Sequence, residues 1–257
     1  MKKLKINYLY DNSVAEIILN DGKGNVLDHT MIEELQELLD SFITKNDLKL
    51  ITFEGAGKHF SFGASVEEHK KEFAEAMLKG FHKLFFTIRD LSIPTMAKIH
   101  GQCLGGGLEL ALMCNFIFAD KTAKIGQPEI ILGVFPPPAS IILPEKIGLA
   151  KAEELLLTGK VITAEESKAI GLITEVFEDK FHLDTGASKW IEEYILPKSA
   201  ISLRYAVKAV RMKFNHILGN FLPQLEFMYV NQLMQTKDAN EGITSFLEKR
   251  KPIWCNN

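Results

Sequence analysis

The sequence has few cysteines and no long apolar run, and each shortage excludes a class of protein. Cys103, Cys114 and Cys255 are its only cysteines, and none of them stands in CxxC spacing. We therefore expect a reducing compartment and no disulfide framework. The most apolar stretch, residues 130–143, is broken by Gly133 and by prolines, so it is too short to span a bilayer. The basic N-terminus lacks the apolar run of a signal peptide, and we expect a soluble, cytoplasmic protein.

A large excess of charge of either sign is also missing. Thirty lysines and arginines face 33 aspartates and glutamates, which gives a net charge of −3. Such a balance provides no general attraction to nucleic acid or to an anionic membrane surface. Hydrophobic residues fill 46% of the 257 positions, and a chain of this length buries enough apolar surface to fold without a metal or a disulfide.

Strand and helix patterns alternate through the first part of the chain. A turn composition at 11–13 joins two predicted strands into a hairpin, and Thr30 with Glu33 forms a capping-box pair at a predicted helix start. Helical periodicity dominates after residue 151, with an interruption at Pro223. This alternation is typical of an α/β protein with largely parallel strands. The strands are predicted at 5–10, 14–19, 48–53, 95–99 and 116–119, and the helices at 30–42, 66–91 and 106–113.

Three consecutive glycines, Gly105 to Gly107, follow a predicted strand and open a helix. Glycine allows backbone conformations and close approaches that side chains forbid, and the first N–H groups of a helix have no partner within it. Such a turn can hold a phosphate or form an oxyanion hole, or it can simply pack a helix close to a sheet. No GxGxxG and no GK[ST] occurs in this segment, which argues against a nicotinamide or nucleotide-triphosphate enzyme.

Two glutamates near these glycines form a candidate acid/base pair. Glu109 lies between Leu108 and Leu110 at the start of the helix, where the helix dipole is expected to keep it ionised. Glu129 precedes an apolar run, and desolvation is expected to keep its proton on. Carboxyl groups in opposed environments suit acid/base catalysis, although either one can instead cap a helix or meet a lysine at the surface.

Taken together, these segments resemble the crotonase (enoyl-CoA hydratase/isomerase) superfamily over nearly the whole chain. GGGLE at 105–109 and QPEI at 127–130 match the family's most specific motifs. The other matching segments are NVL at 25–27, FSFGASV at 60–66, IPTMAKIHG at 93–101, LTGK at 157–160, AIGLI at 169–173, EG at 241–242 and FLEKRKP at 246–252.

The resemblance implies a fold and an assembly. The fold is a crotonase-like α/β spiral of ββα units, followed by a helical C-terminal trimerisation region. We place a boundary at Pro197, with the α/β core over 1–196 and the helical oligomerisation region over 197–257. The resemblance also implies a homo-oligomer, either a trimer or a hexamer built as a dimer of trimers.

The resemblance further implies the machinery of an acyl-CoA hydratase. By position, the N–H groups of Ala64 and Gly106 match the oxyanion hole that binds the thioester carbonyl. Glu109 matches the glutamate that deprotonates water, and Glu129 matches the one that delivers a proton to carbon. Because both glutamates are present, hydration is favoured over the family's other reactions. Neither a metal nor a redox cofactor is implied. Further contacts to CoA are implied for Ser65, Val66, Phe246 and Lys249.

The sequence departs from the family pattern beside the expected acyl pocket. Phe62 and Ser65 replace an alanine and an aspartate, and three prolines at 136–138 replace flexible glycines. Prolines fix φ and remove amide donors, so a simple straight-chain substrate is not favoured. The segment LGVFPPPASIILPEKIG is most similar to the cyclohexa-1,5-dienecarbonyl-CoA hydratases of anaerobic aromatic degradation.

Other interpretations stay open at this point. A straight-chain enoyl-CoA hydratase, or an isomerase that uses Glu129 alone, has the same motifs. An RNA-binding member of the family is disfavoured because the predicted helix around 28–43 is acidic. His59 and His69 are interpreted as structural or exposed residues, and Tyr229 as a core or subunit contact.

Overall fold

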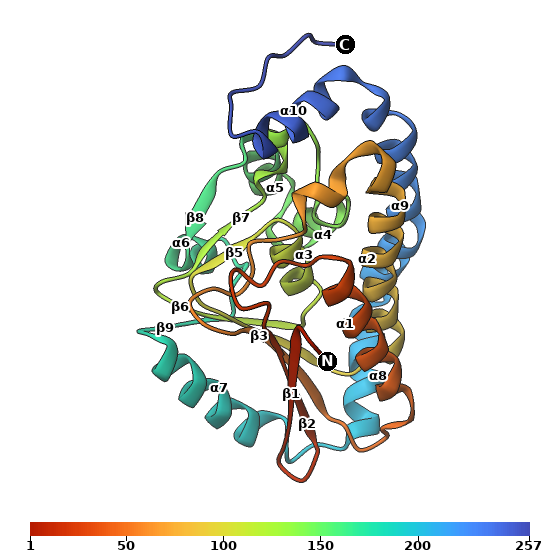
Figure 1. The fold of residues 1–257 in the computed structure, drawn as a ribbon. Coiled ribbons are helices and arrows are strands. Elements are labelled where there is room, and N and C mark those ends of the chain that lie inside the picture. Colours follow the sequence, from red (N-terminus) through yellow and green to blue (C-terminus); the bar gives the residue numbers. More distant parts are fainter.

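The computed structural model describes residues 1–257, and its strands form two sheets (Figure 1). The predicted hairpin and the three further predicted strands are confirmed, with ends shifted by at most two residues. The strands are β1 (Leu4–Leu9), β2 (Val14–Leu19), β3 (Leu50–Gly55), β4 (Thr95–Ile99), β5 (Gln102–Leu104), β6 (Phe116–Asp120), β7 (Lys124–Gly126), β8 (Val161–Thr163) and β9 (Glu175–Phe177).

The two sheets have mixed topology with mostly parallel neighbours. The larger sheet has the order β1-β2-β3-β4-β6-β9, and only its β1–β2 pair is antiparallel. The smaller sheet has the order β5-β7-β8. A strand of the large sheet is twice followed by a strand of the small sheet and then by a helical segment, at β4-β5 and at β6-β7. This succession confirms the expected α/β fold with ββα units.

Ten α-helices and four 3₁₀ turns surround the sheets. The helices are α1 (His29–Ser41), α2 (Lys71–Leu91), α3 (Gly106–Leu112), α4 (Pro137–Ile147), α5 (Leu149–Thr158), α6 (Ala164–Ala169), α7 (Lys180–Tyr194), α8 (Ala200–Val210), α9 (Met212–Asn231) and α10 (Lys237–Leu247). The 3₁₀ turns are η1 (Phe42–Thr44), η2 (Val66–His69), η3 (Pro128–Leu132) and η4 (Leu233–Gln235).

Three local expectations need correction. Helix α1 is capped by Asp28, whose Oδ1 accepts the N–H of Met31 at 3.0 Å, so the predicted capping box at Thr30 does not form. The predicted helix over 66–91 is a 3₁₀ turn and a helix separated by Lys70, whose backbone is extended. Helix α9 continues through Pro223. Buried side chains just before that proline hold the helix in the core, which offsets one missing hydrogen bond.

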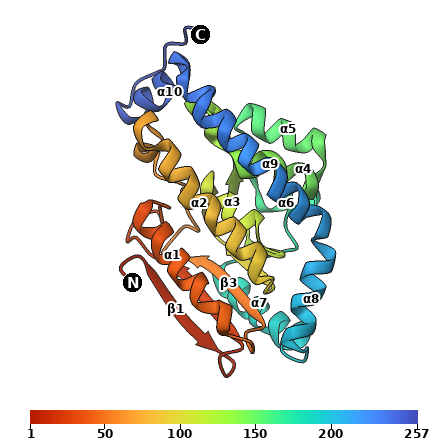
Figure 2. The same cartoon turned by 90° about the vertical axis from the view of Figure 1, so that its right-hand side faces the viewer.

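The main core lies between the large sheet and the helices on one of its faces. Helices α1, α2 and α9 run side by side along the molecule (Figures 1 and 2). Helix α7 covers the opposite face, where its Leu183, Ala187 and Ile191 bury against Met96 and Phe118. Helix α3 is short and entirely buried in the main core, so the glycine turn before it is held in a fixed place.

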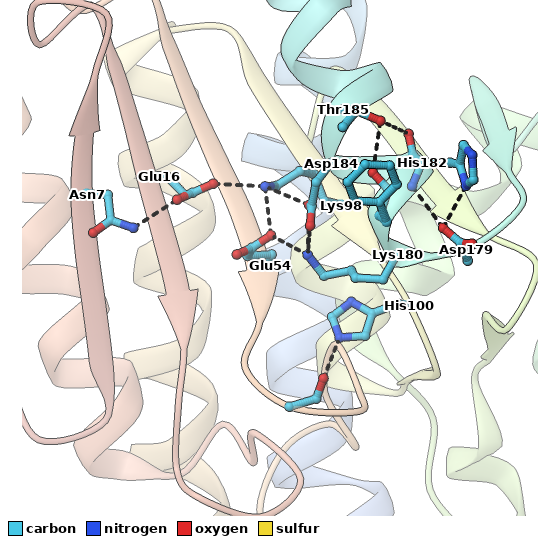
Figure 3. A network of polar contacts seen from close by, with 12 residues as sticks. Asn7, Glu16, Glu54, Lys98, His100, Asp179, Lys180, His182, Asp184 and Thr185 are labelled. Carbon is cyan, nitrogen blue, oxygen red and sulfur yellow. Dashed lines mark hydrogen bonds and ion pairs between the residues drawn. The ribbon is translucent and has the colours of Figure 1, made fainter.

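Helix α7 is also tied to the sheet by charge (Figure 3). Lys98 Nζ of β4 lies 2.8 Å from Glu16 Oε1 of β2 and 2.7 Å from Glu54 Oε2 of β3. Lys180 and Asp184 of α7 complete the network, with Lys180 Nζ 3.2 Å from the same Glu54 oxygen. Burial favours the neutral amine of Lys98, yet the charges of Glu54 and Glu16 raise its pKa above the usual range.

The C-terminal helices follow Pro197 and pack back onto the rest of the chain. Leu218 and Leu222 of α9 belong to the main core, and Tyr229 joins Met77 and Leu78 of α2 in a smaller cluster. The division at Pro197 into a core and an oligomerisation region stays a prediction. No helix is both long enough and apolar enough to cross a membrane.

Candidate active site

The turn between β5 and α3 has a backbone that requires glycine. Gly105 has φ +50° and ψ −129°, a conformation that L side chains rarely adopt. A Cβ at this position would lie only 2.6 Å from Glu129 Oε1. The glycine therefore lets the carboxyl group of η3 approach the start of α3, and it brings together two segments that the sequence separates by more than twenty residues.

The backbones of Gly63–Ala64 and Gly106 face each other across this turn. A Cβ on Gly106 would lie 3.1 Å from Ala64 N, and one on Gly63 would lie 3.3 Å from Gly106 N. The amides of Ala64 and Gly106 are absent from the backbone hydrogen bonds that join turns, loops and caps, and Gly106 opens a helix whose first N–H groups have no intrahelical partner. Both residues line one cavity, so two backbone donors are available to a ligand oxygen there.

Glu109 is the buried carboxyl group of α3, and it is only 4% exposed. Its Oε1 accepts the N–H of Ala139 at 3.0 Å. Because Pro137 and Pro138 open α4 without N–H groups, Ala139 is the first residue of that helix that can donate. Burial raises the pKa of Glu109 to about 8, and the Ala139 bond opposes this shift only in part. The expectation that the helix dipole keeps Glu109 fully ionised is therefore wrong.

Glu129 lies in η3, where the cavity and the glycine turn meet. The side-chain amide of Gln127 lies 3.0 Å from both of its carboxylate oxygens and donates to them when its nitrogen faces Glu129. Burial, and then the charge of Glu109, raises the pKa of Glu129 well above its usual range. This direction agrees with the expectation that desolvation makes Glu129 hold its proton longer. The expected contrast with Glu109 is not found, because desolvation acts on both carboxyl groups.

The cavity that joins these groups has a volume of about 600 Å³ and a mainly hydrophobic lining. Ser65, Val66 and Phe246 line it, together with the two glutamates and the two amide donors. Their contact with CoA stays a prediction. Lys249 is not among the lining residues of the single chain. The apolar walls strengthen the electrostatic interactions of the few polar groups inside.

The proline segment forms one wall of this cavity. Phe135, Pro136 and Pro137 line it, so the departure from the family pattern lies beside the reacting groups, as the sequence indicates. Prolines fix the backbone here and leave no amide donors of their own. The wall is consequently stiff and apolar.

The cavity has two further lining residues, for which the sequence patterns indicate other roles. Tyr229 of α9 is almost fully buried and reaches the cavity from the C-terminal helices. His69 donates through Nδ1 to the carbonyl oxygen of Ser65 at 2.7 Å, and burial lowers its pKa. From the sequence, His69 is interpreted as structural or exposed and Tyr229 as a core or subunit contact, and no local motif distinguishes a cavity wall from a core contact.

No group of three or more histidine, cysteine, aspartate or glutamate side chains gathers in an arrangement that could hold a metal ion. The expectation of a metal-free, cofactor-free site stays a prediction. The chemistry that the site itself offers is hydrogen bonding by two backbone amides and proton transfer by two carboxyl groups.

Comparison with known sequences gives a consistent family. The family model described as enoyl-CoA hydratase/isomerase matches residues 10–257. Cyclohexa-1,5-dienecarbonyl-CoA hydratase of Thauera aromatica is 41% identical over 253 residues, which are 98% of this chain and 97% of that protein. A probable enoyl-CoA hydratase of Bacillus subtilis is 32% identical over 252 residues, 96% of this chain and 97% of that one.

Comparison with solved structures supports the same fold. The enoyl-CoA hydratase from Mycobacterium avium subsp. paratuberculosis has a TM-score of 0.86 at 24% identity and covers 99% of both chains. An enoyl-CoA hydratase from Bacillus anthracis has a TM-score of 0.77 at 29% identity, with 99% of this chain and 100% of that chain covered.

Proposed function

This chain belongs to the enoyl-CoA hydratase/isomerase family, and we propose that it is a hydro-lyase that adds water to a conjugated enoyl- or dienoyl-CoA thioester. Its physiological substrate, we propose, is cyclohexa-1,5-diene-1-carbonyl-CoA in anaerobic aromatic degradation. One observation carries the hydratase assignment. Two carboxyl groups, the buried Glu109 and the half-buried Glu129, line the same apolar cavity as the amides of Ala64 and Gly106.

The two amides would act on the thioester. Their N–H groups bind its carbonyl oxygen and stabilise the negative charge that develops there as the enolate forms. Loss of one such donor typically costs about 10²–10³ in rate. Because Gly106 N belongs to the first turn of α3, the positive end of the helix dipole adds to this stabilisation.

The two glutamates would act on water and on carbon. The ionised fraction of Glu109, which grows as the pH approaches its pKa of about 8, takes a proton from water while the water oxygen bonds to the β-carbon. The electron pair of the double bond moves toward the thioester oxygen. Protonated Glu129 then gives its proton to carbon, which completes the addition of one water. For a cyclic diene that carbon is the far end of the dienolate. The high pKa of Glu129 suits a proton donor near neutral pH.

The cyclic substrate is supported by the proline wall and by the name of the relative from Thauera aromatica. Phe135, Pro136 and Pro137 present a stiff apolar surface, which suits a flat ring better than a flexible chain. The further CoA contacts proposed for Ser65, Val66 and Phe246 lie on the same cavity. The contact proposed for Lys249 requires a neighbouring subunit.

The test compares hydration of crotonyl-CoA and of cyclohexa-1,5-diene-1-carbonyl-CoA by the purified protein. We expect a higher kcat/KM on the cyclic diene. A clear preference for crotonyl-CoA would overturn the cyclic assignment in favour of a straight-chain hydratase. Glu109→Ala is expected to abolish hydration, and a variant that retains double-bond isomerisation at full rate would identify an isomerase that relies on Glu129.

A further inference from the structure

Tyr229 carries a hydroxyl group although its ring packs within a cluster of hydrophobic side chains. It is 1% exposed and belongs to a cluster with Met77, Leu78 and Met234. Its ring meets that of Phe135 edge to face, with centroids 5.5 Å apart and an angle of 66°. Phe135 belongs to the segment that forms the proline wall. The tyrosine ring therefore packs against the wall that the proposed function assigns to the substrate.

The hydroxyl group of Tyr229 has no hydrogen-bond partner although it is buried from solvent. Burying a hydroxyl without an acceptor is unfavourable, and phenylalanine would fill the same space without that cost. This unpaired hydroxyl group on the cavity wall indicates that its hydrogen-bond acceptor forms only during the reaction.

Glu109 and Glu129 line the same cavity as Tyr229, so their carboxyl groups are the candidate acceptors for this hydroxyl. Burial raises the pKa of Tyr229, and the charges of Glu129 and then Glu109 raise it further. The phenol therefore keeps its proton at any working pH, so it can donate a hydrogen bond but cannot act as a base. A carboxylate accepts such a bond far more strongly than a protonated carboxyl group.

Other charged groups around the site are already engaged or lie at its mouth. Glu226 is on the same helix as Tyr229 and is bound to His82 of α2, with Oε2 to Nδ1 at 2.8 Å. Asp238 of α10 accepts the N–H groups of Cys255 and Asn256. The remaining titratable groups that line the cavity are Glu67, His69, Glu109 and Glu129.

We propose that the Tyr229 hydroxyl is a positioning group that donates a hydrogen bond to the Glu129 carboxylate after Glu129 has given its proton to the substrate. This inference rests on the proposed function. No proton leaves Tyr229: the O–H turns toward the new anion, and the bond is released when Glu129 takes up a proton again. Tyr229 thereby stabilises the negative charge on Glu129, beside the Glu109 carboxyl group that has taken up the proton of the water.

The test is Tyr229→Phe, which removes the hydroxyl and keeps the ring. Donation to the ionised form lowers the pKa of Glu129, so its removal raises that pKa. We expect the basic limb of the pH profile of kcat/KM to move up by about one unit. We expect kcat to fall about three- to tenfold with KM unchanged, because the proton leaves Glu129 less readily. Tyr194→Phe, at an exposed tyrosine of α7, is the matched control and leaves the profile unchanged.

A second measurement separates this inference from the proposed function. The Glu129 carboxyl is titrated directly by ¹³C NMR in protein labelled on glutamate, with Glu129→Gln used to assign its signal. A higher midpoint in Tyr229→Phe supports the inference even if the wild-type protein hydrates no thioester, a result that would overturn the proposed function alone. Equal midpoints in the two proteins, or an unshifted basic limb, would overturn the role of Tyr229. The thermal midpoint of Tyr229→Phe is expected to equal or exceed that of the wild type, because an unpaired hydroxyl has been removed.

Discussion

Glu109 is a carboxylic acid enclosed by apolar residues of its own helix and by the first turn of α4. Its pKa is about 8 in the folded protein, against an ordinary value of 4.5. Between these two values the unfolded chain has released the proton and the folded chain still holds it. The folded state therefore loses stability as the pH rises from about 4.5 to about 8.

Glu109→Gln is accordingly expected to stabilise the protein while it abolishes hydration. The amide oxygen can still accept the Ala139 N–H, and no charge has to be buried. The gain in the free energy of unfolding should be near zero at pH 4.5 and about 4 kcal/mol at pH 8. Urea unfolding at the two pH values measures it. Glu67→Gln, at an exposed residue that also lines the cavity, serves as the control and should change stability by less than about 0.5 kcal/mol.

Gly105 allows a second prediction at the level of one residue. In Gly105→Ala the new Cβ would lie 2.6 Å from Glu129 Oε1, and the backbone φ of +50° is strained for alanine. We expect a loss of about 1–3 kcal/mol of stability together with a loss of hydration, since Glu129 must move. Gly80→Ala in α2 is the control, because its Cβ meets only Ile32 at 3.7 Å. Retained activity in Gly105→Ala would contradict the close approach of the two segments.

Among single residues of the site, some properties can be predicted from sequence patterns and others cannot. The glycine turn and both glutamates are predictable because local motifs carry them. The high pKa of Glu109 is not, since it depends on the Ala139 turn and on burial by segments distant in the chain. Tyr229 is unpredictable for the same reason: its helical spacing is that of any core residue, and only the packing of α9 brings it to the cavity.

At the level of elements, side chains alternate between the two faces of each strand. This alternation places the charged side chain of Lys98 on the face of the sheet that α7 covers. Lys98 follows Met96 on one face of β4, and its Cα pairs with that of Glu54 in β3. The predicted strand at 95–99 is correct, yet its pattern does not reveal that a buried ion network will join it to a helix more than eighty residues away. Such partners become visible only when the sheet order is known.

Lys98→Met is expected to destabilise the fold and to spare the chemistry. It leaves Glu16 and Glu54 close together without their shared cation, and breaking a buried pair in this way typically costs about 3–5 kcal/mol. Folded protein should hydrate at the wild-type rate, because the network lies on the face of the sheet that α7 covers. Lys121→Met, whose partner Glu178 is exposed, should change stability by less than about 0.5 kcal/mol. Equal effects in chemical denaturation of the two variants would count against the network.

At the scale of the whole molecule, the C-terminal helices expose several large apolar side chains. They lie along α8 and α9 and in the junction between these helices. The exposed residues are Ile201, Tyr205, Val210, Met212, Phe221, Phe227 and Met228. This surface favours the trimer that the family resemblance implies for residues 197–257, and it stays a prediction in the single chain.

Sedimentation equilibrium should therefore give a mass of three or six times 28.9 kDa. The double variant Val210→Glu and Phe227→Glu adds charge to this apolar surface and should release the monomer. The reason is that a carboxylate buried in the subunit contact without a partner is strongly unfavourable. If Lys249 of a neighbour contacts CoA, the released monomer should also show a raised KM with a smaller change in kcat. A wild-type mass of 28.9 kDa would refute the assembly, and Lys249 would then have no route to the substrate, since it is absent from the cavity of its own chain.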